Sequence, residues 1–271
     1  MNKYLQILLT LGLISIPLGF YAVEHGHRTS GQKIEVAVVS RGVEARSSSS
    51  RPQVALIFDD LGGSLREIKD IYSLDVPVTV AVIPGLKFSK NVAHIAKRCG
   101  FSVLIHLPLA PKRDQDYAHA DYQFIGAHLS RTERESLLRY YLGSISIAMG
   151  ANNHMGSAAT EDSEVMEQVI RALERKDMIF VDSRTSLKSV ACEVAQREQV
   201  PCYVNNGFVD SVHGEKIIEK KFEKLMSRAR EKRKIIIIAH PKKDTMRVLK
   251  KMIPRYSSVD FITLEEYAAQ R

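Results

Sequence analysis

From residue 54 onward, short runs of apolar residues alternate with longer segments in which apolar side chains recur every three or four positions. The short runs predict strands, and the periodic segments predict amphipathic helices. The expected strands cover residues 54–58, 78–83, 101–105, 144–149, 178–181, 201–204, 235–239 and 259–262. The expected helices cover residues 64–73, 89–99, 130–142, 162–176, 188–198, 215–232 and 244–253. This alternation predicts an α/β fold with a parallel sheet and helices outside it.

The number of repeated units favours one kind of parallel sheet. The runs at 54–58 and 235–238 are apolar throughout, as strands buried on both faces are. Seven or eight strand–helix units in about 220 residues suit a closed or nearly closed (β/α) barrel better than an open sheet. Two helices begin with the pattern of a capping box, Ser64 with Glu67 and Ser130 with Glu133. The connection at 107–129 is too long for an ordinary loop, and we expect it to line or cover a site.

The chain begins with a segment of a different kind. Residues 5–23 are almost entirely apolar and carry no charge, and Lys3 precedes them. This pattern predicts an export signal or an N-terminal membrane anchor, and the lack of a clear small-x-small cleavage site favours the anchor. In both cases the rest of the chain lies outside the cytoplasm, in the periplasm or cell envelope. A cytosolic protein with a buried N-terminal helix is the alternative. Residues 24–52 are polar and predict a flexible linker to a domain at 53–271.

The net charge of +8 is unevenly distributed along the chain. Residues 216–255 contain fifteen Lys or Arg and four Asp or Glu, so the remainder of the chain is slightly acidic. Most of these basic residues fall in helical periodicity, which favours a solvated helix face over a surface for an anionic polymer or an anionic lipid. The basic run lacks the interleaved aromatic residues of a single-strand binder, so nucleic acid is not an expected partner.

The cysteines exclude some classes of protein. Cys99, Cys192 and Cys202 are too few for a disulfide scaffold, and their spacing matches no zinc motif. Cys192 and Cys202 would pair in an oxidising compartment, but buried reduced thiols are an equally good interpretation. The sequence leaves both open.

Chemically reactive residues follow the ends of the expected strands. Because the carboxyl ends of parallel strands meet at one rim of a barrel, we expect these residues to form one site. This convergence of scattered positions is a stronger indication of function than any single residue among them. They are Asp59, Asp60, His106, Asn152, Asn153, His154, Asp182, Asp210 and His240.

Asp59 and Asp60 stand side by side after the first expected strand. Helix capping is one explanation, but Ser64 already supplies a cap, and a glycine pair separates the acids from the helix. A divalent metal explains the pair better, because one carboxylate can bind the cation while its neighbour accepts a proton from water. The three histidines of this set would add imidazoles, although any one of them alone could be an ordinary core histidine. No nucleophile elbow, P-loop or dinucleotide fingerprint is present.

Five short motifs, in this order, carry a resemblance to a known family: FDDLG at 58–62, HLPLAP at 106–111, NNHMGS at 152–157, FVDSRTS at 180–186 and AHP at 239–241. With them the chain resembles the divergent polysaccharide deacetylase family, which is related to carbohydrate esterases of the polysaccharide deacetylase type. The resemblance extends over about residues 53–267. It implies a distorted (β/α) barrel of about seven parallel strands. It also implies metal-dependent hydrolysis of N-acetyl groups on peptidoglycan or another N-acetylated glycan.

The resemblance also implies roles for individual residues. Asp59 would be the general base, and Asp60 and His106 would bind the metal. Typical deacetylases have a second histidine where this chain has Ala110, which cannot bind a metal, and His154 is the expected substitute. The resulting Asp–His–His set suits a divalent metal, with zinc the expected ion. The remaining roles are His240 as general acid, Asp182 as an orienting residue of the catalytic group, and substrate binding by Asn152, Asn153 and Asp210.

A catalytically impaired envelope protein that binds metal and glycan is the alternative function. Ala110 supports this alternative, and so does Asn205, where the family pattern leads us to expect a basic residue. A different metallohydrolase that acts on a small amide is a third hypothesis. Asp59 separates binding from hydrolysis, because a binding protein does not need a second carboxylate beside the metal ligand.

Overall fold

The structure is a computed structural model that describes residues 51–113 and 122–269. Its strands are β1 (Gln53–Leu61), β2 (Thr79–Val82), β3 (Ser102–Leu109), β4 (Gly150–Met155), β5 (Ile179–Asp182), β6 (Cys202–Val204), β7 (Lys234–Ala239) and β8 (Asp260–Ile262). Its α-helices are α1 (Leu65–Tyr72), α2 (Ser89–Arg98), α3 (Arg131–Ser144), α4 (Ser163–Glu174), α5 (Ala191–Arg197), α6 (Glu215–Lys232), α7 (Lys243–Met252) and α8 (Leu264–Ala269). Two 3₁₀ helices are η2 (Ala159–Glu161) and η3 (Ile253–Tyr256).

The N-terminal predictions are not tested by these residues. The expected anchor at 1–23 and nearly all of the linker at 24–52 lie outside the described ranges. Within residues 51–113 and 122–269, no helix has both the length and the apolar character that crossing a membrane requires.

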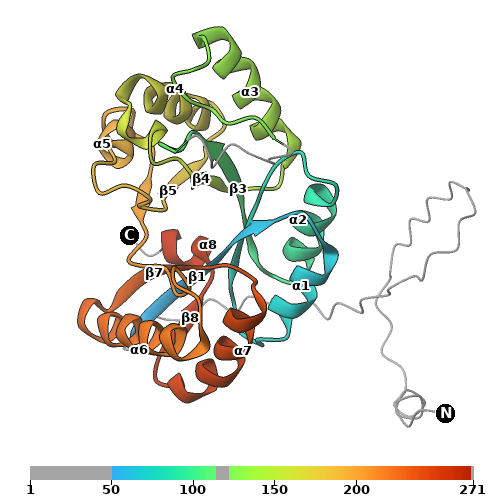
Figure 1. Cartoon of the computed structure of the whole chain (residues 1–271), viewed down its shortest axis with the longest axis vertical. Coiled ribbons are helices and arrows are strands. Elements are labelled where there is room, and N and C mark those ends of the chain that lie inside the picture. The colour runs from blue at the N-terminus through green and yellow to red at the C-terminus, as the bar shows by residue number, and fades with distance from the viewer. Residues whose placement is uncertain (1–50, 114–121, 270–271) are drawn as a thin grey trace, which may run out of the picture. The chain divides into compact units, whose positions relative to one another are not determined.

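The strands form one parallel sheet in the order β6-β5-β4-β3-β2-β1-β7, and β8 also pairs with β1. The segment that follows β6 pairs with β7, and this pairing joins the two edges of the sheet. Phe208 forms a bridge with Ile238 of β7, and the Val209 N–H donates to the Ile238 carbonyl at 2.8 Å. The sheet is therefore a distorted barrel, which confirms the expected fold class, and α1–α7 lie around its outside (Figure 1).

Alternate residues of each strand enter two separate cores. In β1, Ala55 and Ile57 face the inside of the barrel, where they meet Ile236 of β7. Leu56 and Phe58 belong to the larger core between the sheet and the outer helices. Because both faces of the strand are buried, its sequence is apolar without alternation.

Helix α8 closes one end of the barrel. Leu264 belongs to the inner core, and its backbone N–H donates to the Thr79 hydroxyl at the start of β2 at 2.8 Å. Lys234, at the start of β7, donates to the Tyr267 carbonyl at 2.7 Å. These contacts lie at the amino ends of the strands, so the carboxyl ends form the open rim.

The fourth strand lies later than the sequence pattern predicts. Residues 145–149 form a turn, and β4 covers Gly150–Met155, so the prediction of a strand at 144–149 is wrong. Glycine is needed at the start of β4, because a side chain at Gly150 would collide with the Ile179 backbone of β5. The polar residues of β4 are consequently strand residues and not loop residues.

Two other strands, β1 and β3, extend further than their apolar runs predict. β1 continues to Leu61 and β3 continues to Leu109, so Asp59, Asp60 and His106 lie inside strands and not after them. The hydrophobic pattern ends where site residues begin, although the backbone pairing continues beyond that point.

The helices agree with the expected segments to within a few residues at each end, and α6 has the expected bounds. The capping box of Ser130 with Glu133 is confirmed. Ser64 caps α1 by accepting from the Arg66 N–H at 3.1 Å, not from Glu67. Helix α8 is absent from the sequence prediction, because six residues are too few to show a helical period.

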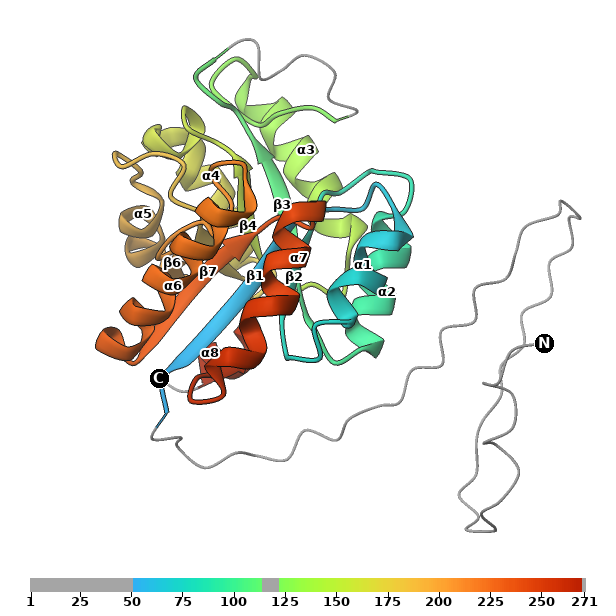
Figure 2. The same ribbon diagram turned by 60° about the horizontal axis from the view of Figure 1, so that its bottom comes forward.

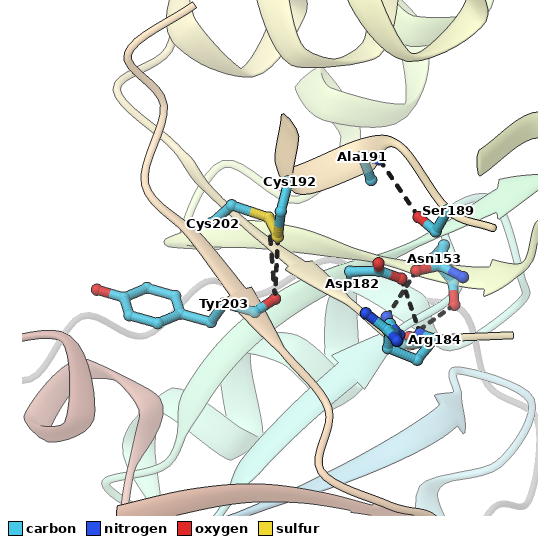
Figure 3. Close-up of a disulfide and its surroundings, with 9 residues drawn as sticks. Asn153, Asp182, Arg184, Ser189, Ala191, Cys192, Cys202 and Tyr203 are labelled. Atoms are coloured by element: carbon cyan, nitrogen blue, oxygen red, sulfur yellow. Dashed lines mark hydrogen bonds between the residues drawn. A yellow bond between two sulfur atoms is a disulfide. The ribbon is translucent and has the colours of Figure 1, made fainter. Parts of the chain in front are cut away.

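A disulfide joins α5 to β6. Cys192 and Cys202 are bonded, with their Cα atoms 5.4 Å apart, and Figure 3 shows the bond beside the strand that carries Tyr203. Cys99 is a half-buried free cysteine. The structure thus selects one of the two alternatives that the sequence leaves open.

Candidate metal centre and active site

A bulge in β1 lets two consecutive carboxylates reach the same site. Successive side chains of a regular strand point to opposite faces. The pairing of β1 with β2 changes register between Phe58 and Leu61, and Asp60 has a left-handed backbone with φ 66°. Such bulges re-aim a side chain. As a result, Asp59 and Asp60 both approach His106.

Asp60, His106 and His154 form a compact group contributed by β1, β3 and β4. Oδ1 of Asp60 lies 3.1 Å from Nε2 of His106 and 2.8 Å from Nδ1 of His154. The three potential ligand atoms all lie within 4.8 Å of one another. Ligand atoms around a tetrahedral zinc ion are about 3.3 Å apart, so the group has the dimensions of a metal site. The structure thus brings together the three residues expected to be ligands.

The environment of His106 fits a cation. The Asn152 amide nitrogen donates to Oδ1 of Asp59 at 2.8 Å, which turns the Asn152 amide oxygen towards Nδ1 of His106, also at 2.8 Å. Nδ1 therefore carries a proton, and in the neutral ring the lone pair of Nε2 faces the Asp60 carboxylate. Two acceptors facing each other need a positive charge between them or a doubly protonated ring. A metal ion held by Asp60, His106 and His154 satisfies this requirement.

The two carboxylates have different ionisation properties. Burial opposes ionisation of Asp60, but hydrogen bonds from His106 and His154 in their protonated forms outweigh it and hold its pKa well below the usual range. Burial raises the pKa of Asp59 above its usual value, against the lowering effect of His106 and His240. Asp60 is thus the anionic partner of the imidazoles, and Asp59 is the carboxylate with the higher proton affinity.

His240 is held at the rim by a buried carboxylate. Nδ1 of His240 lies 2.9 Å from Oδ1 of Asp210, and its backbone N–H donates to Oδ2 of Asp210 at 2.9 Å. The Thr245 hydroxyl also donates to Oδ2 at 2.8 Å. Burial disfavours the protonated ring, but the Asp210 hydrogen bond and the Asp60 charge outweigh it and raise the pKa of His240. Nε2 of His240, 3.6 Å from Asp60, is left facing the metal group.

The environment of Asp210 differs from the expected one. We expect Asp210 to bind substrate, yet its side chain is buried and both oxygens are used by His240 and Thr245. Its geometry is that of an orienting carboxylate for His240, the function expected of Asp182.

Asp182 and Asn153 lie on the outer side of their strands. Oδ1 of Asp182 accepts from the Arg184 N–H at 2.7 Å, and its pKa is raised by burial. Asn153 accepts from the Ser183 N–H at 2.8 Å and donates to the Met155 carbonyl at 2.6 Å. Figure 3 shows Asp182 of β5 and Asn153 of β4 close to Arg184, which belongs to the loop that follows β5. These contacts hold the loop in place. Neither side chain reaches the metal group, because both stand at strand positions that face away from the inside of the barrel.

Tyr122 and Phe124 belong to this site and are not among the residues that the sequence indicates. The Tyr122 hydroxyl lies 2.8 Å from Nε2 of His154, and the Phe124 ring stacks on the His154 ring. Both come from the connection expected to line the site. The only sequence signal was the length of that connection, because two aromatic residues in a loop show no period.

The fold and the site together define a class, that of (β/α) barrels with a candidate metal centre at the carboxyl ends of their strands. The sequence profile described as "Divergent polysaccharide deacetylase" matches residues 56–268. The chain belongs to this family.

Two relatives are about 30% identical to it over most of its length. A protein from Haemophilus influenzae is 30% identical over 214 residues, which cover 78% of this chain and 75% of that protein. The Escherichia coli K12 protein YibQ is 31% identical over 201 residues, which cover 74% of this chain and 62% of that protein. Both are described as uncharacterized.

Solved structures support the fold. An uncharacterized protein from Agrobacterium tumefaciens superimposes with a TM-score of 0.74 at 18% identity, over 82% of this chain and 91% of that one. A lactam utilization protein from Thermus thermophilus gives a TM-score of 0.58 at 13% identity, over 78% of this chain and 99% of that one. At these identities the comparison concerns the barrel alone.

Proposed function

We propose that this protein is a metal-dependent hydrolase that removes N-acetyl groups from an extracytoplasmic polysaccharide. The observation that carries the proposal is the position of Asp59, a buried second carboxylate beside the group Asp60, His106 and His154. A site that only binds a metal has no use for this carboxylate, whereas hydrolysis needs a group that accepts a proton from water.

The residues divide the chemistry among them. When bound, a divalent cation supplies Lewis-acid chemistry, since it polarises the amide carbonyl and lowers the pKa of a water molecule. Asp59 accepts the proton of that water, and a cation on Asp60 favours the ionised form of Asp59 that this step requires. His240 donates a proton through Nε2 to the departing sugar amine, and Asp210 holds its ring in place. Asn152 holds the tautomer of His106.

Zinc is the proposed ion. One carboxylate with two imidazoles and an open position is a typical catalytic zinc environment. Cobalt, nickel and iron accept similar ligands, so loading each metal separately and measuring bound metal and activity identifies the functional one.

The proposed location is outside the cytoplasm, in the periplasm or envelope, with the chain anchored to the membrane or exported by its N-terminal segment. The apolar stretch at 5–23 supports this, as does the disulfide between Cys192 and Cys202, because disulfides persist in oxidising compartments. The substrate would then be peptidoglycan or another N-acetylated envelope glycan.

A catalytically impaired metal- and glycan-binding protein is the second candidate. Ala110 favours it, because this buried residue offers no donor where typical deacetylases have a second histidine. In the structure His154 occupies the third position of the metal group instead.

Release of free amine from N-acetylated glycans decides between the two. The metal-loaded wild type is compared with Asp59→Asn and His240→Ala, and with Asp70→Asn on the exposed face of α1 as a control. We expect both site variants to lose about 100-fold or more in rate, and Asp70→Asn to lose none. Equal rates in wild type, Asp59→Asn and His240→Ala would exclude the mechanism, and retained metal binding without amine release would favour the binding protein.

A further inference from the structure

Two cavities lie beside the loops that follow the two neighbours of β1, and lysines line both. β1 carries Asp59 and Asp60, and its neighbours in the sheet are β2 and β7 (Figure 2). The first cavity, of about 430 Å³, lies where the loop after β2 and the start of α2 meet the end of α3. The second, of about 180 Å³, lies between the loops that precede α6 and α7. Since the loops after β2 and β7 leave the same ends of parallel strands, both cavities belong to the rim of the candidate active site.

A backbone hydrogen bond connects each cavity to a segment that carries a site residue. Between the lining residues Lys87 and Ser89 of the first cavity, the Phe88 N–H donates at 3.0 Å to the carbonyl of Gly62, two positions after Asp60. In the second, the Lys242 N–H donates at 2.7 Å to the carbonyl of His240. The wall of each cavity is therefore continuous with a segment that carries a residue of the candidate site.

The charge of the first cavity is positive. Its lining includes Lys87 and Lys90 and no acidic residue. Both lysines are exposed, and neither forms an ion pair with any residue that the structure describes. The ammonium group of Lys87 lies 5.1 Å from the centre of the Phe88 ring, a contact that leaves its charge uncompensated.

The second cavity also carries two lysines. Its lining contains Lys242 and Lys243, again exposed and without an ion-pair partner among the described residues. It also contains two acids, Asp210 and Asp244, but Asp210 is used by His240, and Asp244 pairs with Arg247 at 3.0 Å. The two lysine charges therefore remain available to a ligand.

The first cavity also has a surface suited to a sugar ring. Tyr140 lines it with 58% of its side chain exposed, an unusual exposure for a large ring. An exposed aromatic face packs well against the apolar face of a sugar ring. The volume of the cavity also exceeds what a single small anion needs. Asn91, also in the lining, supplies an amide for hydroxyl groups.

From these observations we propose that the polysaccharide is acidic, with anionic groups that bind Lys87 and Lys90 in the first cavity and Lys242 and Lys243 in the second. This inference rests on the proposed function, the hydrolysis of N-acetyl groups at the metal group. Lysine is a point charge and accepts carboxylate and phosphate alike, so the shared chemistry is an anionic N-acetylated glycan. Four uncompensated charges also attract such a polymer from a distance, in a salt-dependent way.

The test measures binding first and hydrolysis second. The full chain carrying Asp59→Asn, which prevents turnover, is titrated with three oligosaccharides of equal length. One is a neutral N-acetylglucosamine oligomer, one alternates N-acetylglucosamine with glucuronate, and one is an N-acetylglucosamine 1-phosphate polymer. We expect the anionic ligands to bind about tenfold more tightly than the neutral one at low salt, and the advantage to shrink as salt rises. The stronger of the two anionic ligands shows whether carboxylate or phosphate is the natural group.

Variants in the same background assign the effect to the cavities. Lys87→Gln with Lys90→Gln, and Lys242→Gln with Lys243→Gln, should each weaken binding of the anionic ligands about three- to tenfold and leave the neutral ligand unchanged. Tyr140→Ala should weaken all three ligands. Lys232→Gln with Lys250→Gln, at the carboxyl ends of α6 and α7, is the control for loss of two charges and should change nothing.

Equal affinity for neutral and anionic ligands, or anion binding that neither lysine pair affects, overturns the inference. Amine release with Asp59 restored is then measured on the same ligands. Lysine-dependent binding without amine release would leave the acidic-glycan inference standing and contradict the deacetylase proposal. Hydrolysis with no preference for anionic substrates would support the deacetylase proposal and contradict the acidic-glycan inference.

Discussion

Two neighbouring carboxylates in this protein have different environments because the backbone turns between them. Asp60 adopts φ 66° and reaches both imidazoles, while Asp59 keeps an extended strand position and is 2% exposed. In the proposed function, the same residue type would supply an anionic ligand at one position and a proton acceptor at the next.

Replacing each of these carboxylates should separate metal binding from catalysis. Asp60→Asn removes the anionic ligand, so we expect metal affinity to fall by about 100-fold or more. Asp59→Asn should bind metal nearly as well as the wild type while losing hydrolysis. Metal content after dialysis, and calorimetric titration with zinc, measure the difference. Loss of metal from both variants to the same extent would argue against the division of roles.

The Tyr122 hydroxyl should strengthen metal binding through His154. Partners of this kind orient a ligating imidazole and raise its basicity, and removing one costs about 10- to 100-fold in affinity. Tyr122→Phe keeps the ring beside Phe124 and removes only the hydroxyl, so we expect a zinc affinity about tenfold weaker with an unchanged fold by circular dichroism.

Tyr72→Phe, a half-exposed tyrosine on α1, is the matched control and should bind zinc as the wild type does. Unchanged affinity in Tyr122→Phe would mean that its hydroxyl is not a partner of a ligating His154.

At the scale of the elements, strand parity decides which strand-end residues meet. Asn152 points inward to Asp59 and His106, whereas Asn153, its neighbour, points outward to the loop after β5. In β5, Val181 belongs to the inner core and Asp182 to the outer side. The sequence pattern predicts Asn152 and Asn153 after the end of a strand, whereas they lie inside β4, so the hydrophobic pattern alone could not assign their faces.

The bond between Cys192 and Cys202 should stabilise the part of the barrel that carries the loop after β5. Closing a short loop of about ten residues contributes about 2–3 kcal/mol. We expect reduction, or Cys192→Ser with Cys202→Ser, to lower the melting temperature by about 5–10 °C. Differential scanning fluorimetry with and without a reductant measures this.

Cys99→Ser provides the control, since Cys99 is a free cysteine at the end of α2, between β2 and β3. Its melting temperature should fall on reduction as the wild type's does. A melting temperature that reduction leaves unchanged in the wild type would show that the bond does not form or does not contribute.

At the scale of the whole molecule, the barrel brings together residues separated by nearly two hundred positions. β1 lies between β2 and β7, so Asp59 and Asp60 stand between His106 on one side and His240 on the other. Helix α8 closes the opposite end, which leaves the carboxyl rim for the site. Because the candidate ligands come from three strands, a bound metal would link these strands in the folded state only.

Metal binding should therefore stabilise the fold against heat. A ligand present at about 100 times its dissociation constant adds about 2.7 kcal/mol if it binds only the folded state. We expect a chelator to lower the melting temperature of the wild type by several degrees and zinc to restore it. Asp60→Asn should show neither change. An identical response of both proteins to chelator would place the metal elsewhere.

The sequence by itself determined the alternation of strand and helix, the parallel barrel and the set of reactive residues at its rim, because period and motif are local properties of a chain. Only the tertiary structure decided that Asp210 and not Asp182 contacts His240, that Tyr122 contacts His154, and that two lysine-lined cavities form beside the loops after β2 and β7. These outcomes depend on bulge, register and closure of the sheet. Each arises from the packing of distant segments, and no local pattern encodes it.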